Sequence, residues 1–194
     1  MNNKKVLISA FILVAFIQLY VPAKMIWDRE EILKSGVAYK FKTAPIDPSD
    51  PFRGKYITLS YDHNTVMVEN EKDWLRGEEV YVYLIKNNEG YAEIDSISKE
   101  EPTDDYNYLK TTVGYVSGNG SNKLTINFPF DRFYMEESKA YNAELAYRES
   151  QRDTSKMTYA LVHIKKVEAV LKDVYIDGIG IREIVKGNQK KNDP

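Results

Sequence analysis

An uncharged apolar run near the N-terminus constrains this chain more than any other feature. The run covers residues 6–21, is interrupted only by Ser9 and Gln18, and has an apolar continuation to Trp27. A helix that is apolar on every side has no face for water, so a core helix of a soluble domain explains the run poorly. At about 1.5 Å per residue, the run and its continuation are long enough to cross a bilayer core of roughly 30 Å. The sequence therefore predicts a membrane segment within residues 1–27.

The residues around this segment predict where the rest of the chain lies. Lys4 and Lys5 favour a cytoplasmic N-terminus, because basic flanks tend to stay on that side of the membrane. The small residues that end at Ala23 also resemble a signal peptidase site. Both interpretations export residues 28–186. We favour an uncleaved anchor in the cytoplasmic membrane, with the domain on its periplasmic or extracellular face. The alternative is secretion after cleavage at Ala23.

The composition excludes several classes of function. Lys and Arg number 27 and Asp and Glu 29, so the net charge of −2 provides no positive field for nucleic acid. The absence of cysteine removes thiol catalysis, disulfides and cysteine-ligated metal sites. The two histidines, His63 and His163, are too few for a metal cage and have no catalytic partner at a recognisable spacing. We therefore expect no cofactor, no metal site and no nucleic-acid partner.

Alternation of apolar and polar residues dominates the exported part and predicts strands. One helix is predicted at 135–148, and the polar residues 187–194 are predicted to be a disordered tail. The pattern indicates a mainly β (α+β) domain over residues 28–186, an antiparallel sheet folded as a sandwich or partly open barrel behind one N-terminal transmembrane helix. The predicted strands are 37–43, 55–61, 79–85, 91–94, 109–116, 123–128, 157–164, 169–171, 174–176 and 179–185.

A proline-rich loop before the second of these strands is the most distinctive part of the sequence. Asp47 and Asp50 lie among three prolines and are suited to accept backbone hydrogen bonds in tight turns. Arg53 can pair with either carboxylate, and Gly54 permits a conformation or a close approach that a side chain would prevent. These residues are typical of a stiff loop. Such a loop, held by a rigid scaffold, is also a position where binding residues occur.

The strand that follows the loop separates its side chains onto two faces. Leu59 and Tyr61 share a face with Ile57 and are predicted to pack in the core, whereas Tyr56 points to the opposite face. Tyr56 is therefore the candidate contact residue. With Asp47, Asp50, Arg53 and Gly54, it forms the predicted ligand- or partner-binding site.

The stretch Gly54-Lys55-Tyr56-Ile57-Thr58-Leu59-Ser60-Tyr61 resembles the signature of the GDYXXLXY family of membrane-anchored bacterial proteins. Gly54, Tyr56, Leu59 and Tyr61 match the motif, and Lys55 stands where the family has Asp. The resemblance implies an envelope location and this type of domain, and it implies no substrate and no catalytic residue.

The leading functional hypothesis is a non-enzymatic, membrane-tethered domain that binds or organises another envelope or membrane protein. Two alternatives stay open. One is an acid–base hydrolase that uses Asp47 or Asp50, which raised carboxyl pKa values in a cleft would favour. The other is a small-ligand sensor, which an apolar pocket beside Tyr56 would favour.

Overall fold

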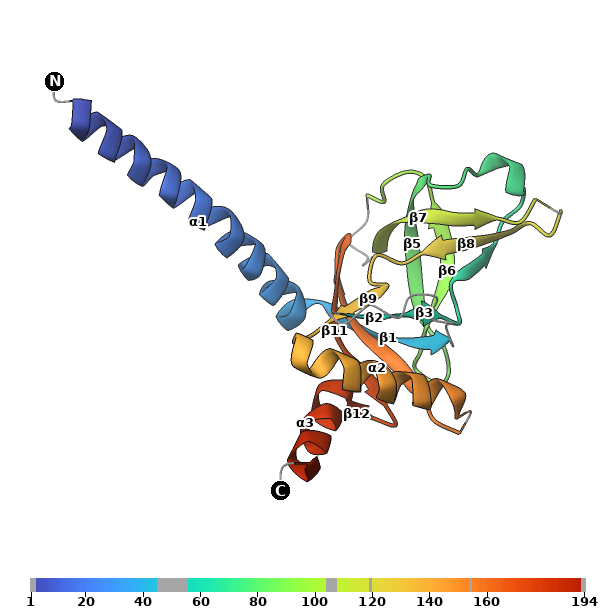
Figure 1. The fold of residues 1–194 in the computed structure, drawn as a ribbon. Helices are drawn as coiled ribbons and strands as arrows, with labels where there is room; N and C mark the ends of the chain where they lie inside the picture. Colours follow the sequence, from blue (N-terminus) through green and yellow to red (C-terminus); the bar gives the residue numbers. More distant parts are fainter. Residues whose placement is uncertain (1–2, 45–55, 104–107, 119, 154, 193–194) are drawn as a thin grey trace.

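The computed structural model describes residues 3–44, 56–103, 108–118, 120–153 and 155–192, and it has two parts (Figure 1). One is a single long helix, α1 (Asn3–Ser35), and the other is a domain of sheets and shorter helices at its C-terminal end. The apolar part of α1 is exposed along its whole length, with Phe11 at 72 % and Trp27 at 74 %. By length and composition α1 can cross a membrane, as predicted.

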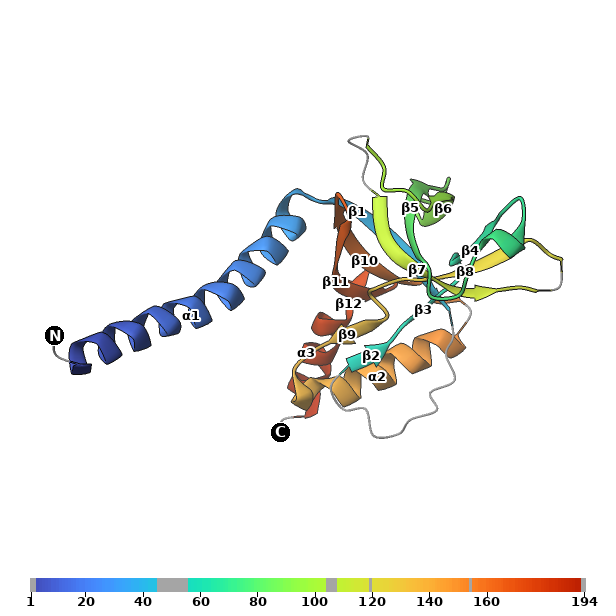
Figure 2. The same cartoon turned by 90° about the horizontal axis from the view of Figure 1, so that it is seen from above.

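The domain is built from antiparallel strand pairs in two larger sheets and one small one (Figure 2). The first sheet has the order β12 (Ile179–Gly180), β11 (Glu168–Ile176), β10 (Thr158–Lys165), β1 (Val37–Ala44) and β3 (Ser60–Tyr61). The second has the order β4 (Thr65–Met67), β8 (Lys123–Asn127), β7 (Tyr108–Val116), β5 (Glu79–Lys86) and β6 (Ala92–Ser98). The small sheet pairs β2 (Tyr56–Thr58) with β9 (Arg132–Tyr134). The predicted mainly β, antiparallel fold is confirmed.

Aromatic side chains from the first sheet and from the segment after β8 meet in the core. Phe41 of β1 lies with its ring centroid 5.7 Å from Tyr61, 5.1 Å from Phe128 and 4.8 Å from Phe130. The Tyr61 hydroxyl donates a hydrogen bond to the Phe130 carbonyl at 2.7 Å, so its polar group is satisfied inside the core. This cluster connects the end of the sequence motif to the centre of the domain.

The motif segment forms two short strands instead of the single strand predicted over 55–61. β2 pairs with β9, and β3 pairs with β1, with the change of partner at Leu59. The Leu59 amide donates to the Asp131 carbonyl at 2.8 Å across this break. The predicted alternation nevertheless holds, because Ile57, Leu59 and Tyr61 are 1 %, 4 % and 6 % exposed.

Helix α2 (Glu137–Arg152) covers the end of the first sheet and is held there by polar contacts. Gln151 Nε2 donates to Thr43 Oγ1 at 2.9 Å, and Thr43 Oγ1 donates to the Thr158 carbonyl at 3.1 Å. Tyr147 is 5 % exposed on the same side of α2. Burial raises the pKa of Tyr147 to about 12, and the nearby Thr43 offsets this only in part. Within the described residues, the Tyr147 hydroxyl makes no hydrogen bond of ordinary geometry.

Helix α3 (Ile181–Asn192) corrects the prediction for the C-terminal part of the domain. The predicted turn is present, with φ of 50° at Asp177 and 81° at Gly178. The predicted second strand of the hairpin, 179–185, is present only at its first two residues, and the prediction is wrong for the rest. Ile181 and Val185 are fully buried and four residues apart, which places them on one face of a helix. The helix continues through 187–192, where disorder was predicted.

The C-terminal end of α1 is docked directly on the first sheet. Ile32 is 4 % exposed, so the last turns of the helix bury an apolar side chain against the domain. Arg29 donates from Nη1 to the Ala169 carbonyl at 3.4 Å, and Lys165 forms an ion pair with Glu31. These contacts join the helix to β10 and β11.

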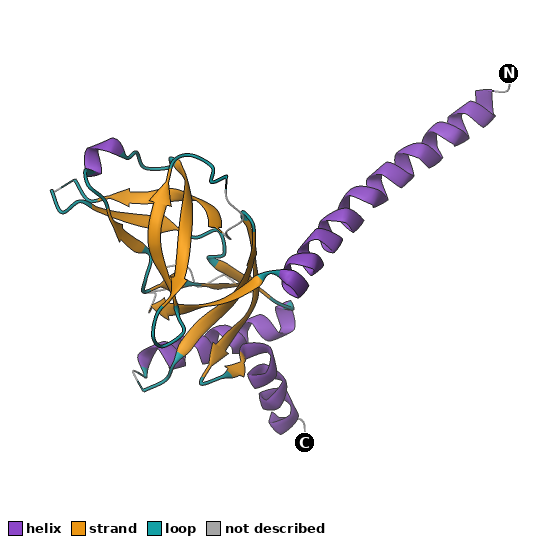
Figure 3. Ribbon diagram, turned by 180° about the vertical axis from the view of Figure 1, so that it is seen from behind, coloured by secondary structure: helices purple, strands orange, loops and turns teal. Residues whose placement is uncertain are grey.

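Gly36 closes this junction. Its amide donates to the Ile32 carbonyl at 2.8 Å, which completes the last turn of α1 immediately before β1 begins. A β-carbon on Gly36 would lie 2.6 Å from the Ile32 carbonyl oxygen and 3.0 Å from the Ile164 carbonyl oxygen. Only glycine therefore fits between the helix and β10 without displacing backbone. The helix projects away from the domain (Figure 3).

Candidate functional site

An exposed cluster of aromatic and cationic side chains lies on the small sheet. Tyr56 begins β2 and is the register partner of Tyr134 on β9. The two rings have centroids 5.3 Å apart, and the guanidinium carbon of Arg132 lies 5.1 Å from the Tyr56 ring centroid. Tyr134 is 60 % exposed and Tyr56 is half-buried. We call Tyr56, Arg132 and Tyr134 the β2–β9 surface.

The electrostatics of this surface keep a positive charge beside two electron-rich rings. The pKa of Arg132 is raised above its usual value, first by a hydrogen bond with the Tyr134 side chain and then by the charges of Tyr56 and Asp131. A guanidinium over an aromatic face is attracted to the ring quadrupole, and it has five N–H donors in its plane. The arrangement provides flat apolar area next to a donor for carboxylate or carbonyl groups.

The structure separates the predicted motif residues into core and surface. Leu59 and Tyr61 lie in the core, and Tyr56 lies on the β2–β9 surface. The remaining predicted site residues, Asp47, Asp50, Arg53 and Gly54, lie outside the described residues. Of the predicted binding site, Tyr56 therefore lies within the described residues.

Arg132 and Tyr134 were not predicted as site residues. They lie on the outward face of β9, while Phe133 between them is 2 % exposed. The alternation of Arg132, Phe133 and Tyr134 was the available signal, since it resembles a short half-exposed strand. The pairing of that strand with Tyr56, more than seventy residues earlier, could not be read from the sequence.

A buried carboxylate elsewhere in the domain has a structural role. Glu71 is 6 % exposed and lies in the short helix η1 (Glu71–Asp73). Its carboxylate accepts hydrogen bonds from the backbone N–H groups of Gly120 at 2.9 Å and Asn122 at 3.1 Å. These donors belong to the turn between β7 and β8, so Glu71 holds that hairpin. Its acceptors are already used within the chain.

The described part of the chain shows no group of three or more His, Asp or Glu side chains that could hold a metal ion. His163 lies on β10, and burial lowers its pKa, with Lys172 contributing. His63 is exposed just after β3. The two histidines are thus on different elements.

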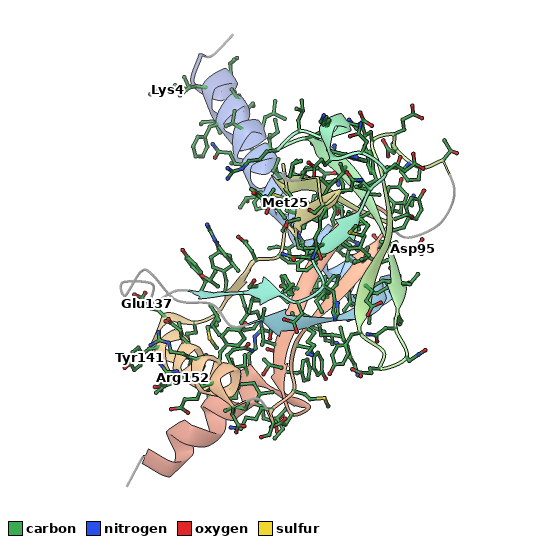
Figure 4. The ribbon with its side chains drawn as sticks, turned by 90° about the vertical axis from the view of Figure 1, so that its right-hand side faces the viewer. Lys4, Met25, Asp95, Glu137, Tyr141 and Arg152 are labelled. Carbon is green, nitrogen blue, oxygen red and sulfur yellow. The ribbon has the colours of Figure 1, made fainter. Side chains whose placement is uncertain are left out.

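Helix α2 adds a second exposed aromatic residue near the small sheet. Tyr141 is 70 % exposed, and Figure 4 labels it between Glu137 and Arg152 along α2. Leu145, one turn later on the same face, is 42 % exposed. α2 also contacts β2, so the helix lies beside the small sheet.

The fold and the surface define a class of protein: an antiparallel β domain fixed to the end of one apolar helix of membrane-spanning length. The chain belongs to the GDYXXLXY family, because the sequence model described as GDYXXLXY protein matches residues 18–174. This match confirms the resemblance seen in the motif, and it extends from within α1 to β11. Neither a curated protein nor a solved structure matches the chain.

Proposed function

We propose that this chain is a single-pass protein of the cytoplasmic membrane whose domain, on the periplasmic or extracellular face, binds another envelope component. α1 supports the anchoring, because it is apolar, exposed and of sufficient length. Lys4 and Lys5 at its start support the orientation, since basic flanks favour the cytoplasmic side.

The observation that carries the binding role is the exposed β2–β9 surface. Tyr and Arg are the residue types that most often contribute the largest share of binding energy at interfaces. Here they are already packed on one another, so a partner would meet side chains whose freedom is partly lost before binding. The surface suits a partner that offers an apolar group beside a carboxylate or carbonyl oxygen, which Arg132 would bind through charge-assisted hydrogen bonds.

Two substitutions on this surface test the binding role in the full chain. Tyr56→Ala and Arg132→Ala should each reduce the amount of partner that co-purifies from gently solubilised membranes by more than about tenfold, as expected for residues that dominate an interface. Tyr115→Ala is a matched control, because Tyr115 is also 60 % exposed and lies on β7, away from the small sheet. Equal recovery of the partner with all three variants would contradict the proposal.

The same preparation tests the orientation. The chain has no cysteine, so Glu89→Cys in the exposed turn between β5 and β6 would supply its one thiol. A membrane-impermeant maleimide should label this thiol in spheroplasts before lysis. Labelling only after lysis would place the domain in the cytoplasm and reject the proposed location.

A further inference from the structure

A polar residue interrupts α1 in the middle of its apolar part. Gln18 lies about midway between Val6 and Trp27, and its side chain is exposed on the helix. A carboxamide has one acceptor oxygen and two N–H donors. In the hydrocarbon core of a bilayer there is no water to satisfy these groups, so they favour a partner that can form hydrogen bonds.

The backbone at Gln18 lacks a donor as well. In an α-helix the carbonyl of each residue accepts a hydrogen bond from the N–H four residues later. The residue four positions after Gln18 is Pro22, which lies inside α1 and has no N–H. The Gln18 carbonyl therefore has no usual helical donor. Gln18 thus has both a polar side chain and a backbone carbonyl without its helical donor near the middle of the bilayer, where polar groups are least well solvated.

Gln18 points to the same side of α1 as the domain. Gly36, which closes the docked junction, lies eighteen residues after Gln18, or about five turns of 3.6 residues. Arg29 and Ile32 contact the domain. Viewed down the helix axis, their spacing from Gln18 places each of them within about 40° of Gln18. In Figures 1 and 3 the domain lies beyond the C-terminal end of α1 and to one side of it.

We infer that the face of α1 formed by Phe11, Ala15, Gln18, Pro22 and Met25 binds a membrane helix of another integral membrane protein. That helix offers a hydrogen-bonding side chain near the bilayer midplane and ends at the membrane surface beneath the domain. These five residues recur at three- and four-residue spacing, which makes one continuous stripe. The small Ala15 lets a neighbouring helix approach Gln18 closely. The inference rests on the membrane anchoring that we proposed for α1.

A second copy of this chain fits the same face poorly. Two parallel helices packed through Gln18 would have axes about 8–10 Å apart. Each copy also carries its domain on that face, at Arg29 and Ile32. Both domains would then compete for the space between the two helices. A partner whose helix stops at the membrane surface avoids this clash.

Two phenylalanines provide a matched test of the face. Phe11 lies on the Gln18 side and is 72 % exposed, whereas Phe16 lies on the opposite side and is 69 % exposed. Each is replaced in turn by the photo-reactive p-benzoylphenylalanine in the full chain, within the membranes of its native host. We expect the Phe11 position to crosslink to a transmembrane peptide of another protein, and the Phe16 position to give at least about fivefold less of that adduct.

Gln18→Leu should then reduce the Phe11 adduct by about three- to tenfold, the range expected when one interhelical hydrogen bond is lost. Ser9→Leu is the control, because Ser9 is a polar residue on the opposite face. An adduct that contains only this chain, or one that is unchanged by Gln18→Leu, would overturn the inference.

Resistance of the chain to extraction with alkaline carbonate separates the two proposals. A chain that stays in the membrane but gives no Phe11 adduct would overturn the helix partner alone. A chain that is released from the membrane would overturn the anchoring and, with it, this inference.

Discussion

Replacing Gly36 by alanine tests whether α1 and the first sheet form one rigid unit. The added β-carbon would lie 2.6 Å from the Ile32 carbonyl oxygen of α1 and 3.0 Å from the Ile164 carbonyl oxygen of β10. Ordinary contact begins at 3.4 Å, so it must move about 0.8 Å away from the last turn of the helix and about 0.4 Å away from the sheet. Both close atoms are backbone oxygens, of Ile32 and Ile164, so no side chain can rotate away. Overpacking of this kind costs about 2–3 kcal/mol. For a domain of this size, the melting temperature should fall by about 4–12 °C.

The measurement is thermal unfolding of the detergent-solubilised full chain, followed by circular dichroism. Gly187→Ala is the control, because a β-carbon there meets no atom within 4 Å and the residue lies inside α3. Its melting temperature should stay the same or rise slightly, since alanine favours a helix over glycine by up to about 1 kcal/mol. If the melting temperature of Gly36→Ala equals that of the unmodified chain, the junction is looser than its contacts indicate.

Two further predictions concern the core. Leu59→Ala should lower the free energy of unfolding by about 2–5 kcal/mol in denaturant titrations, because Leu59 is 4 % exposed, whereas Leu145→Ala, 42 % exposed on α2, should change it by about 0.5 kcal/mol or less. Equal losses would show that the motif strand is not core. Since burial raises the pKa of Tyr147 to about 12 from 10.0, the folded chain keeps this proton between those values while the unfolded chain loses it. Stability should therefore fall as pH rises through this window, by up to about 1.4 kcal/mol per unit, and Tyr147→Phe should have a shallower fall.

Local sequence patterns predicted the elements whose partners are close along the chain. The hairpin of β5 and β6 and the hairpin of β7 and β8 were expected from two-residue alternation around short turns, and both are present. The break at Leu59 was not predictable in this way, because β2 and β3 obtain their hydrogen bonds from β9 and β1. Helix α3 was missed because the Asp177-Gly178 turn indicated a hairpin, although the spacing of Ile181 and Val185 favoured a helix.

The candidate surface was predictable only at Tyr56. The alternation around Leu59 and Tyr61 was sufficient to assign which face is core, because that depends on a strand's own residues. Whether Tyr56 has neighbours on the other face depends on tertiary pairing with Arg132 and Tyr134. A single sequence contains no direct record of such a contact.

Because the domain is docked on α1, the length of the helix sets the direction in which the domain faces as well as its distance from the membrane. A flexible linker tolerates added or lost residues, but here Ile32 and Gly36 attach the domain to a helix that continues from the apolar span. Each residue inserted between Trp27 and Asp28 would turn the domain by about 100° around the helix axis and raise it by about 1.5 Å. One added residue would thus turn the β2–β9 surface to a new direction around the helix. Four added residues would return it nearly to its original direction. Natural variation in this short segment should therefore be restricted to whole helical turns.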